Sequence, residues 1–111
     1  RYLRMLRMEN NVLTIVRKDT GTMRVAVSGY TLQDGDTLTL SISEELDTET
    51  PAISLTSSAF VDNGCSFELT SEHTDLEPGT YYYDVQLDRA DGSVDTIIGP
   101  DKMKVIGGVT W

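Results

Sequence analysis

Residues 76–87 read Leu-Glu-Pro-Gly-Thr-Tyr-Tyr-Tyr-Asp-Val-Gln-Leu, a turn followed by a strict alternation of side chains. The Pro-Gly pair predicts the turn, and the period of two predicts a strand that buries one face. We expect Tyr81 and Tyr83 to face the interior and Tyr82 to face outward. In a β-sandwich, a tyrosine at the start of a central strand commonly hydrogen-bonds the backbone just before it, and Tyr81 is placed to do so.

The same alternation, or a short run of β-branched residues, recurs along most of the chain. Clusters of Gly, Asp, Asn and Pro separate these runs at intervals of about 8–12 residues, which is typical of a sandwich. We therefore predict an all-β fold, an immunoglobulin-like antiparallel β-sandwich of about seven to eight strands. The predicted strands are residues 12–16, 22–28, 37–43, 52–56, 60–70, 80–88, 94–98 and 103–106.

Several connections are also predicted. The strand at 52–56 is expected at a sheet edge because Pro51 precedes it. Asn63-Gly64 is either a bulge or a hairpin turn. A helical turn at 71–76 is expected to cross between the sheets, and Gly99-Pro100-Asp101 to turn the chain before the last strand. We expect Gly79, Gly92, Tyr81 and Tyr83 to be structural residues.

The chain is strongly acidic but its charge is uneven. It has 9 Lys and Arg against 18 Asp and Glu, a net charge of −9. Arg1, Arg4 and Arg7 give +3 in the first eight residues, so the rest, with 6 basic and 18 acidic residues, carries −12. This balance argues against nucleic acid and anionic membrane surfaces as partners. No apolar run is long enough for a transmembrane helix.

We divide the chain into three parts. Residues 1–10 are expected to form an N-terminal arm or extension, or a first strand; residues 11–107 the β-sandwich domain; and residues 108–111 a C-terminal tail. The basic start could pack against the acidic body of another copy, and Tyr and Trp are residue types that concentrate in protein interfaces. The possible interface residues are Arg1, Arg4, Arg7, Tyr82 and Trp111, although Trp111 at the very end is equally compatible with a disordered tail.

No group of residues specifies a reaction, and we predict a protein that is not an enzyme, with no catalytic, cofactor-binding or metal site. His73 is the single histidine and is expected in a solvated turn. Cys65 is the single cysteine and alternates with core residues, so core filling is expected. Asp34-Gly35-Asp36 offers two oxygen ligands for calcium, but turn chemistry explains the pattern equally well.

Residues 76–87, followed by Asp-Gly-Ser-Val-Asp-Thr-Ile-Ile-Gly at 91–99, resemble a module of tailed-phage structural proteins. The chain is similar to the immunoglobulin-like N-terminal domains of baseplate upper proteins and related tail and head fibre proteins. The other shared elements are the turn at residues 17–21 and the closing Val109-Thr110, so the resemblance covers about residues 12–110.

The resemblance implies a non-enzymatic structural or docking module of a phage or prophage virion, made in the bacterial cytoplasm. Its expected partners are other virion proteins or copies of itself, in a possible homo-oligomer. The family has no catalytic residues to transfer. The alternative is a carbohydrate-binding or adhesin-type immunoglobulin-like module on a bacterial surface, because outward Tyr82 could stack on a sugar ring.

Overall fold

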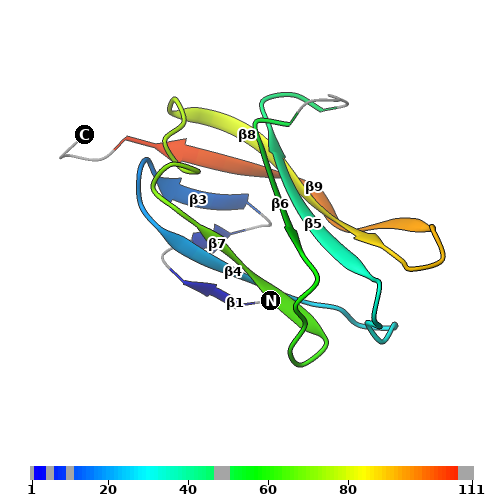
Figure 1. Ribbon diagram of the computed structural model, residues 1–111. Helices are drawn as coiled ribbons and strands as arrows, with labels where there is room; N and C mark the ends of the chain where they lie inside the picture. The colour runs from blue at the N-terminus through cyan, green and yellow to red at the C-terminus, as the bar shows by residue number, and fades with distance from the viewer. Residues whose placement is uncertain (1, 5–6, 10–11, 47–50, 108–111) are drawn as a thin grey trace.

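Two β-sheets packed face to face make up the structure, a computed structural model that describes all residues except 1, 5–6, 10–11, 47–50 and 108–111 (Figure 1). A three-stranded sheet has the order β1-β4-β7, and a six-stranded sheet the order β2-β3-β9-β8-β5-β6. The part of the chain that the structure describes contains no helix. The strands are β1 (Tyr2–Arg4), β2 (Arg7–Glu9), β3 (Val12–Val16), β4 (Gly21–Ala26), β5 (Thr37–Ser43), β6 (Ile53–Ser57), β7 (Gly64–Leu69), β8 (Gly79–Asp88) and β9 (Val94–Ile106).

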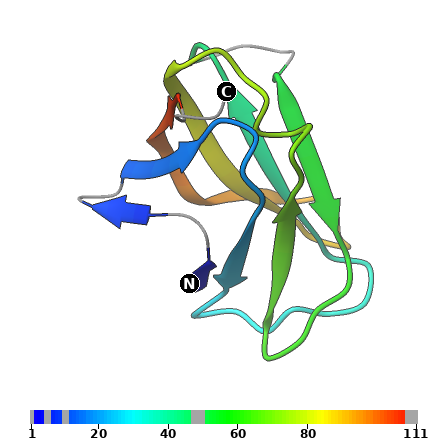
Figure 2. The ribbon, with the colours of Figure 1, turned by 90° about the vertical axis from the view of Figure 1, so that its left-hand side faces the viewer.

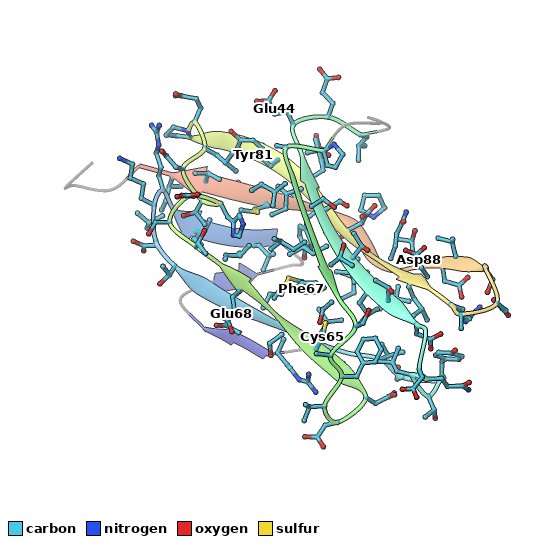
Figure 3. The ribbon with its side chains drawn as sticks, in the orientation of Figure 1. Glu44, Cys65, Phe67, Glu68, Tyr81 and Asp88 are labelled. Carbon is cyan, nitrogen blue, oxygen red and sulfur yellow. The ribbon has the colours of Figure 1, made fainter. Side chains whose placement is uncertain are left out.

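The core lies between the sheets and follows the alternation of the sequence. On β5 and β8 every second side chain is buried, and the residues between them are only partly buried. Cys65 and Phe67 on β7 fill the space from the small sheet (Figure 3). Burial raises the pKa of the Cys65 thiol, as expected for a core-filling cysteine. The predicted all-β sandwich is therefore confirmed.

The assignment of strands to sheets matches an immunoglobulin sandwich, in which the second and fifth strands share one sheet and the third, sixth and seventh share the other. Counting from β3 as the first, β4 and β7 lie in the small sheet, and β5, β8 and β9 in the large one. The fourth, β6, pairs with β5 at the edge of the large sheet, as predicted from Pro51. Figures 1 and 2 show β6 beside β7, where the curled large sheet meets the small one.

The predicted tyrosine corner is present at the start of β8. The Tyr81 hydroxyl donates a hydrogen bond of 2.8 Å to the Glu77 carbonyl oxygen, four residues earlier. The Tyr81 ring is buried, so one residue both enters the core and holds the crossover that precedes it. The crossover is a single turn, with a hydrogen bond from Thr74 N–H to the Thr70 carbonyl, and it carries the chain from β7 to β8 as predicted.

The prediction for Gly99-Pro100-Asp101 was wrong. These residues do not turn the chain but lie within one 13-residue strand, β9. The ladder with β8 shifts register on either side of Val85, so Gly99 and Pro100 together lie across from Asp84 as a bulge. Gly99 has a φ of 79°, and proline lacks the N–H that a regular ladder needs; both are accommodated at a bulge.

The large sheet is mixed, whereas we expected antiparallel pairing throughout. β3 pairs with β9 in parallel, with Leu13 opposite Met103 and Val16 opposite Ile106. The remaining pairs in both sheets are antiparallel in the described residues. Parallel neighbours need a long connection, which here is nearly the whole domain.

The first ten residues supply strands. β1 pairs with β4 in the small sheet, and β2 pairs with β3 at the edge of the large sheet. We predicted either an arm or a first strand for this segment, and residues 2–4 and 7–9 form strands. Arg1 and the tail at 108–111, including Trp111, lie outside the described residues.

Three loops gather at one end of the sandwich (Figure 1): residues 27–36, 58–63 and 89–93. The second of them ends in a tight turn from Val61 to Gly64, closed by two backbone hydrogen bonds of 2.9 and 3.2 Å. Asp62 and Asn63 have φ values of 52° and 57°, the left-handed pair that a type I′ turn requires. Asn63-Gly64 is therefore a turn and not a bulge.

Candidate functional site

A groove of about 440 Å³ lies on the outer face of the large sheet. Its floor comes from the outward side chains of β5 and β8, and β9 contributes through its bulge. The β5–β6 connection supplies the other residues. The groove is lined by Ser41, Ser43, Glu45, Leu46, Pro51, Tyr82, Tyr83, Asp84, Gln86 and Pro100.

The alternation that fills the core also builds this groove. On β8 the residues between the buried ones are Tyr82, Asp84 and Gln86, which therefore share the outer face. Ser43 lies directly opposite Tyr82, and Ser41 opposite Asp84, so their side chains are cross-strand neighbours. Figure 3 marks the start and end of this strand with Tyr81 and Asp88. The expected outward orientation of Tyr82 is confirmed, and Tyr82 is half-buried because it lines the groove.

The bulge makes Asp84 the unusual residue of the groove. Asp84 faces the two bulged residues of β9, and one of them, Pro100, lines the groove beside it. Among the described residues, the Asp84 carboxylate accepts no hydrogen bond and makes no ion pair. Burial alone raises the pKa of its carboxyl group, because the partly desolvated carboxylate has no compensating partner. An unpaired carboxylate is thus placed next to an aromatic ring in a partly enclosed space.

The other predicted residues are placed as follows. Tyr81 makes the corner and Tyr83, 1% exposed, lies in the core. Gly79 begins β8, and Gly92 lies in the β8–β9 hairpin with a φ of 95°. Arg4 and Arg7 belong to β1 and β2, and two strands, β3 and β9, separate β2 from β8 and Tyr82. Of the predicted interface residues on described strands, Arg4 and Arg7 therefore belong to strands that are not neighbours of β8, the strand of Tyr82.

Sequence reasoning missed the role of Asp36, which is 1% exposed at the loop end of the sandwich. Its carboxylate accepts hydrogen bonds from Gln33 N–H at 2.9 Å, Tyr30 O–H at 2.8 Å and Ala90 N–H at 2.9 Å. Arg89 lies over the Tyr30 ring, 4.7 Å from its centroid. Asp36 thus links two loops. The signal in the sequence is the second Asp of Asp34-Gly35-Asp36, a pattern that by itself indicates a turn or two calcium ligands.

A second link at this end is Asn63. Its side-chain amide donates to the carbonyls of Val27 and Tyr30, both at 2.8 Å, and its oxygen accepts from Leu32 N–H at 2.7 Å. Hydrogen bonds of the Asp36 and Asn63 side chains therefore connect the three loops to one another.

The Asp36 contacts predict a pH-dependent stability. Hydrogen bonds to the Asp36 carboxylate stabilise its ionised form and so lower its pKa. The bond from Gln33 N–H has the largest effect, and those from Ala90 N–H and Tyr30 O–H have smaller effects. The stabilisation is present above the unfolded pKa of about 3.9 and is lost as the pH falls through the lower folded value. At pH 7 we expect Asp36→Asn to lower the Tm by roughly 5 °C or more, since one acceptor becomes a donor. The difference from the wild type should shrink as the pH falls below the unfolded pKa of about 3.9.

Thermal unfolding followed by circular dichroism between pH 2 and pH 8 tests this. Asp34→Asn is the matched control. Asp34 is exposed in the same loop, and its substitution changes the net charge by the same amount as Asp36→Asn. Equal melting temperatures for the two variants at pH 7 would show that the Asp36 contacts do not stabilise the fold.

His73 lies in the crossover turn as expected, where its Nδ1 accepts a 3.0 Å hydrogen bond from Thr70 N–H. Within the described ranges, no three His, Cys, Asp or Glu side chains are grouped as metal ligands would be. The described part of the chain also has no helix long and apolar enough to span a membrane. Comparisons with protein-family models, with curated proteins and with solved structures found no match.

Proposed function

We propose that this chain is a non-enzymatic docking module of a phage or prophage virion, in the class of baseplate, tail or head fibre proteins. One observation carries the proposal. The two segments that resemble the phage module, 76–87 and 91–99, fold into a single unit: the tyrosine corner, β8, the hairpin and the first half of β9. This unit lies in the middle of the large sheet and forms part of its outer groove.

The mechanism in this proposal is shape and charge. A sandwich with a continuous core and fastened loops presents a fixed outer face to its neighbours. Copies of the chain are suitable partners, because the first eight residues carry +3 and the rest −12. Opposite charges on one molecule favour association of copies at low ionic strength.

The test is the solution mass of the full chain by light scattering at about 0.05 M and 0.5 M salt, where surface attractions are screened to different degrees. We expect a defined oligomer at low salt and dissociation at high salt. The variant with Arg1, Arg4 and Arg7 all changed to Gln should be monomeric at both, with the β1 and β2 backbone pairing retained. A wild-type monomer in both buffers would contradict self-assembly and leave other virion proteins as partners. A gene neighbourhood without capsid or tail genes would contradict the virion assignment.

A second candidate is a carbohydrate-binding or adhesin-type module on a bacterial surface. The groove favours it through the Tyr82 ring, the Gln86 amide and the hydroxyls of Ser41 and Ser43, which are groups that stack on and hydrogen-bond to sugars. A glycan array probed with the wild type and with Tyr82→Ala tests it. Silence of the wild type on the array, together with unchanged cell binding by the variant, would remove this candidate.

A further inference from the structure

We infer that the outer groove is an acceptor for an arginine side chain, supplied by the N-terminal segment of a second copy of this chain. The inference rests on the proposed docking function and adds the contact that would perform it. It depends on the chemistry of the groove, on the charge distribution along the chain and on the positions of the two surfaces.

The groove has the groups that recognise a guanidinium ion. The Asp84 carboxylate is partly buried and forms no ion pair or hydrogen bond with the described residues, and a second carboxylate, Glu45, also lines the groove. The Tyr82 ring lies one outward position along β8 from Asp84. A planar guanidinium can pair with a carboxylate through two parallel hydrogen bonds and can stack on an aromatic face. A sugar would occupy the same space but would leave the Asp84 charge uncompensated.

None of the described residues that line the groove is basic. Lys102 on β9 lies opposite Tyr82, but it is exposed and forms no ion pair with a described carboxylate. The Arg17 and Arg89 side chains are engaged elsewhere, with Asp75 and Asp95 respectively. The described residues therefore supply no cation to this acidic groove, and in the inferred contact another molecule supplies it.

The N-terminal segment of the chain carries suitable donors. Three of its arginines, Arg1, Arg4 and Arg7, fall within the first seven residues. β2 is one edge of the large sheet, and β3 and β9 separate it from β8 and the groove. A donor on one surface and an acceptor on a different surface make a heterologous contact, which closes into a ring or propagates as a filament. Each copy then gives one arginine segment and receives one.

The first arm of the test is a titration of the isotope-labelled full chain with a peptide of residues 1–10, followed by amide chemical shifts. We expect shifts at Ser41, Ser43, Tyr82, Asp84 and Gln86. Asp84→Asn should weaken binding about tenfold, because it removes the charged partner of the guanidinium. Asp88→Asn is the matched control on the same strand and outward face, and should bind within about twofold of the wild type since surface charges outside the contact matter little.

Three results would overturn the inference. Equal weakening by Asp84→Asn and Asp88→Asn would mean that only net charge matters. Equal binding of a peptide with its three arginines changed to glutamine would mean that guanidinium is not recognised. Shifts at these residues with methyl glucoside but not with the peptide would make the groove a sugar site.

The second arm is light scattering of Asp84→Asn beside the wild type at low salt. A wild-type oligomer that becomes a monomer in Asp84→Asn, but not in Asp88→Asn, supports the inference. An oligomer that persists in Asp84→Asn overturns the groove contact and leaves the docking function standing. A monomeric wild type overturns the second copy as the occupant, and with it self-assembly as the form of the proposed function, even where the peptide binds the groove.

Discussion

Changing Gly64 to alanine is expected to lower the free energy of unfolding by about 3 kcal/mol or more, the upper end of what overpacking costs. Gly64 is the first residue of β7 and pairs with Ala26 of β4. A Cβ at this position would lie 2.0 Å from the Val25 carbonyl oxygen and 2.9 Å from the Ala26 Cα. Both are backbone atoms, so relief requires the two strands to separate at the start of their ladder.

Urea unfolding followed by tyrosine fluorescence measures this change. Gly107→Ala is the control, because a Cβ at Gly107 has no atom within 4 Å and that residue has no positive φ. We expect the control to stay within about 0.5 kcal/mol of the wild type, as is usual for surface changes. Equal unfolding midpoints for the two variants would show that β4 and β7 do not approach as closely as described.

Changing Tyr83 to alanine is expected to cost about 3–5 kcal/mol, the usual range for truncating a core aromatic residue. Tyr83 is 1% exposed and is the largest of the fully buried side chains among the described residues. It lies in the middle of β8, opposite Ile42 of β5 and Asp101 of β9. Its loss would leave a cavity between the sheets that the paired strands on both sides cannot close.

The adjacent Tyr82 supplies the control for this prediction. Tyr82→Ala removes the same atoms one position away, on the outer face, and should cost less than about 1 kcal/mol because the side chain is only half-buried. The two variants thus separate the core role of one tyrosine from the groove role of the next. A larger loss for Tyr82→Ala than for Tyr83→Ala in chemical denaturation would mean that β8 is shifted by one residue, because such a shift exchanges its two faces.

The sequence predicted strand positions best for strands that bury only one face. The alternation from Thr37 to Ser43 and from Thr80 to Asp88 identified both strands to within one residue, together with the faces they bury. The tyrosine corner was predictable because its donor and acceptor are only four residues apart. These features depend on local pattern, which a single sequence contains.

Features that depend on distant partners were missed. Gly99-Pro100 is a strong local turn signal, but pairing of β9 with β8 on both sides holds the pair inside the strand as a bulge. The Asp36 carboxylate binds Ala90 N–H, 54 residues away, and this contact has no local signature. For the groove, Tyr82 was predicted as outward, but the placement of Ser41, Ser43 and Pro100 around it depends on cross-strand register.

The parallel pairing of β3 with β9 has a consequence for how the chain folds. Leu13 meets Met103, so β3 finds this neighbour only after all of the chain between the two strands has been synthesised. Such contacts raise the contact order and slow folding to about the millisecond-to-second range typical of all-β domains. Until then, the edge of β3 facing β9 has unpaired backbone groups and is a site for wrong pairing with other chains. The order of synthesis therefore favours a transient in which β4 to β8 have assembled first and both ends of the domain join last.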